Sequence, residues 1–282
     1  DPMARVFITG SSDGLGLAAG LELIAQGHEV VMHGRTIERA DDIRWAAPDV
    51  AEVLIGDLAS TRETSDLAES ANSYGRFDAV IHNAALGYRE PRRVETLEGH
   101  ASVFAVNVLA PYLLTARMTR PGRLVYLTSG MARGGTVSTA DLDWQERAWN
   151  GAQAYSDSKL LVTTLAFAIA RLWPQVPTNA VDPGWVPTRM GGPLAPDDLA
   201  AGSATQLWLA VDEDPAATDH DELVGGLRHL AHEVGRQQHR PALGGETADE
   251  SAHPAHALRV EAVDGLVEDE GRGVAEQRSG DA

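Results

Sequence analysis

The chain of 282 residues contains no cysteine, an absence that excludes disulfides, thiolate metal sites and a cysteine nucleophile. No apolar run approaches the roughly 18 residues that a membrane-spanning helix needs, so we expect no membrane partner. The first residues lack the charged and apolar stretches of a secretion signal, which favours a cytoplasmic protein. Acids outnumber bases, and the formal net charge of −18 argues against nucleic acid as a partner.

Large core-forming residues are missing from the last quarter of the chain. Every aromatic residue falls at or before Trp208, no Ile follows Ile169 and no Met follows Met190. Residues 212–282 are rich in acids, Ala and Gly, a composition typical of disordered segments. We therefore predict a globular body over residues 1–211 and an atypical acidic C-terminal tail over residues 212–282.

The body alternates short apolar strands with amphipathic helices. This alternation indicates βαβ units, whose strands form a doubly wound parallel sheet with helices on both faces, an α/β fold. The predicted strands cover residues 5–9, 29–33, 51–55, 79–82, 123–128 and 178–181. The predicted helices lie near residues 17–24, 37–46, 61–74, 97–119 and 152–173, and a last one ends near residue 210.

A glycine-rich loop joins the first predicted strand to the first predicted helix. It begins at Thr9 and spaces Gly10, Gly14 and Gly16 as GxxxGxG. Small residues in this context let a pyrophosphate approach backbone N–H groups at a helix N-terminus, where the helix dipole favours negative charge. The loop therefore predicts a nucleotide-phosphate site, and the alternative is a plain tight turn.

The residues after the second predicted strand bear on the choice of cofactor. An acidic side chain there would bind the ribose 2′-hydroxyl of NAD, whereas an arginine would accept the 2′-phosphate of NADP. The chain has Arg35 at this point and no acid until Glu38, with Ser12 and His33 as further candidate contacts. Arg35 thus favours NADP(H) over NAD(H), and the alternative is that it only solvates a strand end.

Tyr155 and Lys159 lie four residues apart on a predicted helix, so their side chains share a face. A phenol has an ordinary pKa of about 10, and a nearby ammonium favours its phenolate, so the pair can exchange a proton with an alcohol or carbonyl oxygen. Such pairs also occur on solvated helices. However, a chain with 22 arginines keeps Lys159 as its single lysine, and arginine cannot supply a compact ammonium.

Taken together, these motifs resemble those of the short-chain dehydrogenase/reductase family over about residues 4–211. The family's TGxxxGxG matches the loop that begins at Thr9, and its YxxxK matches Tyr155 and Lys159. Ser129 matches the catalytic serine that follows the fifth strand. The resemblance implies a Rossmann-type fold and hydride transfer between a nicotinamide cofactor and an alcohol or carbonyl.

The resemblance also implies that several strand ends contact the dinucleotide. Residues 57–58 match the acidic position at the adenine, residues 82–85 look like NNAG with two departures, and residues 183–188 match the segment that holds the carboxamide. The implied cofactor contacts are Thr9, Gly10, Ser12, Gly14, Leu15, Gly16, Arg35, Asp57, Leu58, Asn83, Ala84, Ala85, Lys159, Pro183, Gly184, Val186 and Thr188.

Four residues match the family's catalytic set. The resemblance implies that Tyr155 is the general acid and base and that Lys159 binds the nicotinamide ribose and favours the phenolate. Ser129 would hydrogen-bond the reacting oxygen, and Asn107 would hold a water that connects Lys159 to solvent. The alternatives are a strand-end turn for Ser129 and a satisfied helix kink for Asn107.

Ser129 and Tyr155 are 26 residues apart, a longer gap than is usual in the family. The intervening segment 133–149 resembles the retinol-dehydrogenase-like branch, where a segment here borders the substrate cleft. Trp144, Trp149 and Trp185 therefore either line an apolar pocket or pack this segment on the body.

The tail departs from the family, whose members have a last strand after the helix that ends near residue 210. Residues 212–282 contain no aromatic, glycine-flanked segment of that kind. One hypothesis is that the reading frame is lost near residue 215, which sequencing of the coding DNA would test.

The sequence therefore predicts an NADP(H)-dependent oxidoreductase that interconverts an alcohol and a carbonyl on a small or medium apolar substrate. A non-catalytic nucleotide-binding sensor or regulator on the same fold is the first alternative, and an inactive product of the altered tail is the second. We expect no metal, and the family resemblance implies a homodimer or homotetramer.

Overall fold

The computed structural model describes residues 3–136, 138, 140–212 and 257–259 of the chain. Its sheet has the strand order β3-β2-β1-β4-β5-β6-β7, in which neighbours up to β6 pair in parallel. The parallel strands are β1 (Arg5–Ile8), β2 (Glu29–Gly34), β3 (Glu52–Ile55), β4 (Ala79–His82), β5 (Arg123–Leu127) and β6 (Thr178–Val181). The chain starts in the middle of the sheet and winds outward in both directions, as the alternation predicts.

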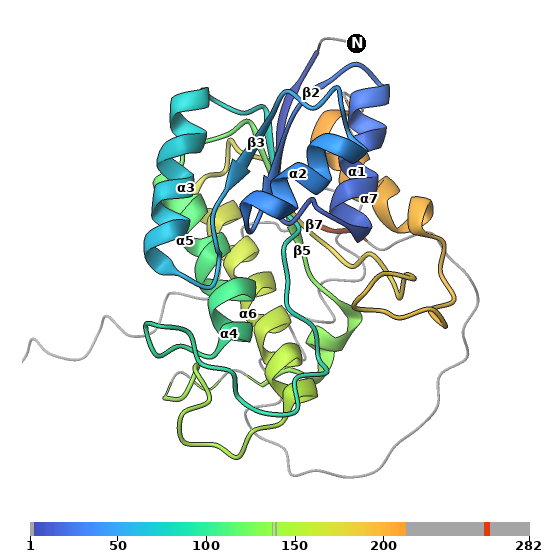
Figure 1. Ribbon diagram of the computed structural model, residues 1–282. Helices are drawn as coiled ribbons and strands as arrows, with labels where there is room; N and C mark the ends of the chain where they lie inside the picture. The colour runs from blue at the N-terminus through green and yellow to red at the C-terminus, as the bar shows by residue number, and fades with distance from the viewer. Residues whose placement is uncertain (1–2, 137, 139, 213–256, 260–282) are drawn as a thin grey trace, which may run out of the picture.

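Helices cover both faces of the sheet, and this arrangement confirms the predicted fold class (Figure 1). One layer contains α1 (Gly14–Ala25), α2 (Ile37–Ala46) and α7 (Leu199–Val211). The other contains α3 (Thr61–Tyr74), α5 (Ala110–Arg117) and α6 (Gly151–Leu172). A short 3₁₀ helix, η2 (Gly130–Gly134), follows β5.

Each face of the sheet has its own core because successive strand residues point to opposite sides. Phe7 and Tyr126 pack beneath α3, α5 and α6, whereas their strand neighbours Ile8 and Val125 pack beneath α1 and α7. All four residues of β4 are buried, as expected for a strand covered on both sides.

The helix predicted near residues 97–119 is wrong at its start and in its regularity. Helix α4 (Ser102–Phe104) begins later, passes into a π-helical turn, η1 (Ala105–Leu109), and continues as α5. Residues 95 and 101 instead form an isolated antiparallel bridge around Gly99, whose φ of 88° excludes a right-handed helix there. The π turn inserts at Asn107, which is a site residue by resemblance.

The tail contributes one short strand that its composition did not predict. Strand β7 (Ala257–Arg259) pairs antiparallel with β6 and extends the sheet at that edge. The predicted acidic tail otherwise lies outside the described residues, and so does the point near residue 215 where the frame hypothesis places the change.

The register of the parallel strands brings the candidate site residues to one edge. Ile8 pairs with Ile81, His82 with Tyr126, and Leu127 with Val181. The loops that follow β1, β4, β5 and β6 therefore emerge side by side at the carboxyl edge of the sheet, where ligands bind in folds of this type.

Candidate active site

The loop after β1 has the backbone shape that its glycines suggested. Gly10 and Gly14 adopt φ values of 65° and 55°, in the left-handed region. A Cβ atom on Gly10 would lie 2.8 Å from the Cα of Ala84, and one on Gly16 would collide with the carbonyl of Gly10. Helix α1 begins here at Gly14, and the side chain of its N-cap residue, Asp13, makes no capping hydrogen bond, so backbone N–H groups of the first turn remain available to a phosphate.

Thr9 and Asn83 bind this loop to the end of β4. The hydroxyl of Thr9 accepts hydrogen bonds from the backbone N–H groups of Asn83 (3.0 Å) and Ala84 (3.1 Å). In return, the Asn83 amide donates to the carbonyls of Thr9 and Gly10, both at 2.9 Å. The predicted contacts after β1 and after β4, including neighbouring Ala85, are therefore parts of one rigid wall.

His33 has a different role from the cofactor contact that we expected. Its Nδ1 accepts the N–H of Gly10 at 2.9 Å, and its Nε2 donates to the carbonyl of Gly56 at 2.8 Å. Burial lowers the pKa of His33, so the ring is neutral and both nitrogens are used inside the protein. His33 positions the glycine loop and has no ring nitrogen left for a 2′-phosphate.

Positive charge gathers where the second strand ends. Arg35 is exposed directly after β2. Arg39, in the first turn of α2, lies 3.6 Å from the carboxylate of Asp13 and 3.2 Å from that of Asp42. Arg189 reaches Asp13 from the opposite loop at 3.3 Å. Sequence reasoning missed Arg39 and Asp13, although the position of Arg39 one turn after Arg35 was a visible signal.

Four further predicted cofactor contacts belong to this end of the site. Ser12 is half-buried in the glycine loop, beside Leu15, which packs against the core under α1. Asp57 follows β3, and its Oδ1 accepts the N–H of Ala59 at 2.9 Å. This hydrogen bond shapes the turn and uses one of the two carboxylate oxygens of Asp57. Leu58 is buried in the core on the other face, so it supports the loop from below.

Tyr155 and Lys159 lie on one face of α6, and both are almost completely buried. The Lys159 ammonium donates to the carbonyl of Leu127 at 2.8 Å and lies 5.6 Å from the centre of the Tyr155 ring. Ser129, two residues past β5, accepts the N–H of Met131 at 3.2 Å, and its hydroxyl lies near enough to the Tyr155 phenol to lower the pKa of that phenol. The structure thus brings together the three side chains that the sequence placed on two separate elements.

Burial dominates the protonation of this pair. The pKa of Tyr155 is raised to about 12, and burial is the largest cause of this rise. The nearby charge of Asp182 also contributes to the rise, while the Ser129 hydroxyl opposes it. Burial lowers the pKa of Lys159 to about 8, against the opposing effect of Asp182. In this structure Lys159 is directed at the Leu127 carbonyl, and the expectation that its ammonium favours the phenolate stays a prediction.

Asn107 in the π turn binds the loop that follows β4. Its Oδ1 accepts the N–H of Leu86 at 2.7 Å, and its Nδ2 donates to the carbonyl of Leu86 at 3.0 Å and to Ser158 at 2.9 Å. Ser158 in turn donates to the carbonyl of Tyr155 at 2.7 Å. Asn107 therefore links this loop to the turn of α6 that carries Tyr155, and a π bulge at a functional site is a recurrent feature of helices.

The segment after β6 covers the glycine loop. Gly184 adopts a φ of 78°, and the Thr188 methyl group lies against Gly14. The Thr188 hydroxyl accepts the N–H of Gly191 at 3.2 Å, and Val186 is buried. Together with Pro183, these predicted contacts form the wall opposite the glycine loop.

The tryptophans of segment 133–149 pack the segment on the body. The rings of Trp144 and Trp149 pack edge to face, with their centroids 5.7 Å apart. Both belong to a small apolar cluster with Val103 and Ala154. The Trp149 indole donates to the carbonyl of Glu90 at 2.9 Å. Trp185 differs, since 52% of it is exposed. Packing is therefore the better interpretation for Trp144 and Trp149.

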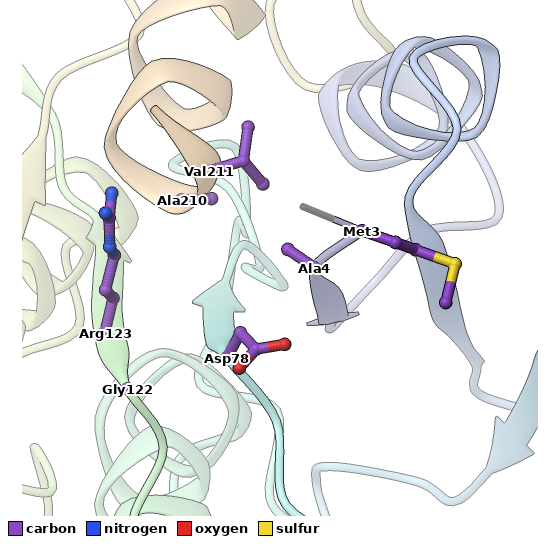
Figure 2. Close-up of a pocket in the computed structure, with 7 residues that line it drawn as sticks. All are labelled: Met3, Ala4, Asp78, Gly122, Arg123, Ala210 and Val211. Atoms are coloured by element: carbon purple, nitrogen blue, oxygen red, sulfur yellow. The ribbon is translucent and has the colours of Figure 1, made fainter. Parts of the chain in front are cut away.

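A pocket of about 280 Å³ lies at the opposite, amino-terminal edge of the sheet (Figure 2). Its polar side chains already serve the fold: Asp78 accepts the N–H of Arg5 at 2.8 Å, and Arg123 donates to the carbonyls of Leu209 and Asp212. We assign no ligand to this pocket.

The described part of the chain contains neither a membrane-spanning helix nor a cluster of metal ligands. No helix there is long and apolar enough to cross a membrane. Nor do three or more His, Asp or Glu side chains gather there in a way that could hold a metal ion.

Known proteins are similar to this chain in sequence and in fold. The family described as short chain dehydrogenase matches residues 4–199. Short-chain dehydrogenase chry4 of Gibberella zeae is 43% identical over 74% of this chain and 81% of its own length. Short-chain dehydrogenase chyC of Penicillium rubens is 40% identical over 80% and 85%.

More distant relatives bear on the branch and the fold. Human retinol dehydrogenase 13 is 27% identical over 83% of this chain and 76% of its own length. The solved structure of a blue fluorescent protein from a metagenomic library, in complex with NADPH, has a TM-score of 0.61 at 19% identity, over 74% of this chain and 91% of that one. This last likeness concerns the fold alone.

Proposed function

The chain belongs to the short-chain dehydrogenase family, whose enzymes act on alcohol and carbonyl groups with NAD(P), and on this premise we propose that it is NADP(H)-dependent and uses Tyr155 as general acid and base. The substrate that we propose is a small or medium apolar alcohol or carbonyl compound. The name of retinol dehydrogenase 13, whose substrate is an apolar alcohol, agrees with that choice. The comparisons do not favour the alternative of a non-catalytic sensor.

The described residues fit a dinucleotide. The positive φ values of Gly10 and Gly14 and the uncapped start of α1 offer backbone N–H groups to the pyrophosphate. Arg35 is exposed where a 2′-phosphate would lie, with Ser12 nearby in the glycine loop. Residues 183–188 would hold the nicotinamide end. When bound, NADP(H) supplies or accepts the hydride.

Tyr155 carries the proton chemistry in this proposal. Its buried hydroxyl, with a pKa raised to about 12, is protonated at neutral pH and can donate to a carbonyl oxygen. Ser129, which faces that hydroxyl, stabilises the negative charge that develops on the substrate's carbonyl oxygen. In the reverse direction Tyr155 accepts the proton of the alcohol.

Lys159 and Asn107 support this exchange. Lys159 would bind the nicotinamide ribose, and its ammonium, which donates to the Leu127 carbonyl at 2.8 Å, has two further N–H donors for that contact. Asn107 keeps the Leu86 loop and α6 in place, where a water can connect Lys159 to solvent. The single observation that carries the proposal is the convergence of Ser129, Tyr155 and Lys159 at the edge of the sheet that also carries the glycine loop.

The test is oxidation of NADPH and NADH against a panel of aldehydes, ketones and quinones, with Tyr155→Phe as the matched variant. We expect faster turnover with NADPH and a loss of about 100-fold or more in Tyr155→Phe, the usual contribution of a general acid. Equal rates in both proteins would reject Tyr155 as the acid. Faster turnover with NADH would reject the role of Arg35.

We also propose that residues 1–211 form the catalytic domain and that the protein assembles as a homodimer or homotetramer. The family resemblance supports the second statement, and size-exclusion chromatography with light scattering tests it. A monomer at micromolar concentration would reject it.

A further inference from the structure

Asp182 is a site residue that no family motif singled out. It follows β6 directly, and the N–H of Thr128 donates to the carbonyl of Val181 at 2.8 Å, so the chain at Asp182 runs beside Ser129. The register of β5 with β6, in which Leu127 pairs with Val181, imposes this neighbourhood.

The carboxylate of Asp182 is held in place on the active-site side. Its Oδ1 accepts the N–H of Gly184 at 3.2 Å. Its Oδ2 lies 3.1 Å from the position that a Cβ atom would take on Gly130, the residue after Ser129. One oxygen is therefore tied to the segment after β6, while the other lies against the backbone beside the catalytic serine.

Four groups face the Tyr155 hydroxyl and ring from the surrounding elements. Ser129 faces the phenol from the loop after β5, and Lys159 lies over the ring from α6. The ring of Tyr88, in the loop after β4, packs edge-on with its centroid 5.7 Å from that of Tyr155. Asp182 is the fourth group, and its negative charge acts on the phenol. Asp157 is closer to Lys159 in sequence, but its carboxylate bonds Arg147 at 3.0 Å.

Asp182 acts on both members of the catalytic pair. The charge of Asp182 raises the pKa of Lys159, which burial lowers. The same charge raises the pKa of Tyr155, which burial also raises. Among the described residues it is the carboxylate whose charge reaches both groups. A negative charge at this place stabilises an ammonium and opposes a phenolate.

We propose that Asp182 is a positioning residue of the catalytic pair, whose carboxylate keeps the Lys159 amine charged and the Tyr155 hydroxyl protonated. The enzyme then rests in the form that donates a proton, which prepares it for carbonyl reduction; this last consequence rests on the proposed function. In reduction the phenol proton moves to the carbonyl oxygen, so a resting phenol needs no prior protonation.

The single lysine makes a direct test possible, because protein labelled with ¹³C at lysine Cε gives one NMR signal, that of Lys159. The pH titration of this signal in the full chain should have its midpoint near 8. In Asp182→Asn, which keeps an oxygen for the Gly184 N–H, the midpoint should fall by about one pH unit. An unchanged midpoint overturns the proposal.

The matched control is Asp198→Asn, which removes a carboxylate from the same segment but keeps the cap of α7. Its Lys159 midpoint should equal that of the wild type, and an equal fall in both variants overturns the proposal. Asp182→Ser, which also retains an oxygen, replaces the Asn variant if that one does not fold. Asp182→Glu, which keeps the charge, should hold the midpoint closer to the wild-type value than Asp182→Asn does.

Kinetics give a second readout. In Asp182→Asn the acidic limb of alcohol oxidation and the alkaline limb of carbonyl reduction should both move to lower pH, whereas a purely structural defect lowers rates without moving the limbs. The NMR titration needs neither substrate nor turnover. A wild-type protein without carbonyl reductase activity would therefore reject the proposed function and leave the titration to decide on Asp182.

Discussion

Arg35 and Arg39 bring positive charge to the same end of the predicted cofactor site, but the structure engages them differently. Arg39 is held by Asp13 and Asp42, so part of its charge is already compensated. Arg35 is exposed directly after β2, at the position that distinguishes the two nicotinamide cofactors in folds of this class. In the proposed function Arg35 would therefore discriminate between the cofactors, and Arg39 would support the loop through Asp13.

Arg35→Ala should raise the KM for NADPH by about tenfold or more, because a hydrogen bond to a charged group contributes about 1.5–3 kcal/mol. The KM for NADH should stay the same, since NADH has no 2′-phosphate. Steady-state kinetics with both cofactors measure this. The control is Arg44→Ala, on the same helix as Arg39 and paired with Asp41, which should change neither value. A parallel rise for both cofactors would assign Arg35 a general role instead.

His82 is a buried base inside the sheet layer. The ring of His82 stacks on that of Tyr126, with the two centroids 4.6 Å apart. Its Nε2 is hydrogen-bonded to the Thr115 hydroxyl at 3.1 Å, while its Nδ1 has no hydrogen-bond partner in the structure. Burial lowers the pKa of His82 to about 3. Since the ordinary value is 6.5, the unfolded chain takes up a proton below that pH and the folded protein does not.

The free energy of unfolding should therefore fall as the pH drops from 6.5 towards 3, by up to about 1.4 kcal/mol per pH unit for this group. His33, whose pKa burial also lowers, adds to the effect in the same direction. Urea unfolding at pH 7, 6 and 5 measures the slope. His82→Gln should give a shallower slope by about one proton. An identical slope in the variant would show that His82 titrates normally.

At the scale of elements, a position in the chain can require glycine for two separate reasons, a left-handed backbone and a lack of space for a Cβ atom. Gly10 and Gly27 both adopt φ values in the left-handed region, 65° and 87°. Only Gly10 is also crowded, because its Cβ position lies 2.8 Å from the Ala84 backbone, whereas nothing lies within 4 Å of that of Gly27. Substitutions at Gly10 and at Gly27 therefore distinguish the cost of backbone strain from the cost of a steric clash.

Gly27→Ala should lower the free energy of unfolding by about 1–2 kcal/mol, the cost of a left-handed alanine. Gly10→Ala should cost more and should also weaken NADPH binding, because the loop must move away from Ala84. Chemical unfolding and a fluorescence titration with NADPH measure the two effects. Similar losses in both variants, with intact NADPH binding, would contradict the wall formed by Thr9, Gly10 and Asn83.

At the scale of the whole molecule, the sheet ends on β7, which comes from the tail. Its antiparallel pairing covers the β6 edge, and open sheet edges expose unpaired backbone groups that favour aggregation. The strand is short, so its contribution to stability depends on a few hydrogen bonds. The tail therefore bears on the stability of the sheet, although the candidate site lies within the body.

A chain that ends at Asp212 should melt about 5 °C or more below the full chain and aggregate more readily, because each lost hydrogen bond costs about 1 kcal/mol. It should still melt cooperatively, and NADPH should raise its midpoint. Differential scanning calorimetry with and without NADPH measures both. An unchanged midpoint would show that β7 contributes nothing, and a non-cooperative melt would contradict the boundary proposed at residue 211.

The sequence alone determined the class of fold, the six parallel strands and the order of the motifs at their ends. Apolar periodicity and glycine placement are local features, and local sterics and burial set them. Local reasoning failed where a neighbouring segment decided the outcome. The π turn at Asn107 is stabilised by the backbone of Leu86, and the ring of His33 is bound by Gly10 and Gly56.

The tertiary structure decided the electrostatics of the catalytic pair. Nothing in the spacing of Tyr155 and Lys159 reveals that burial raises the pKa of the phenol and lowers that of the amine, or that the charge of Asp182, which follows β6, acts on both. A pKa depends on desolvation and on charges within a few ångströms, and strand register brings those charges together from distant parts of the chain. Residue types and their order are written in the sequence, but their electrostatic environment exists only after the sheet has assembled.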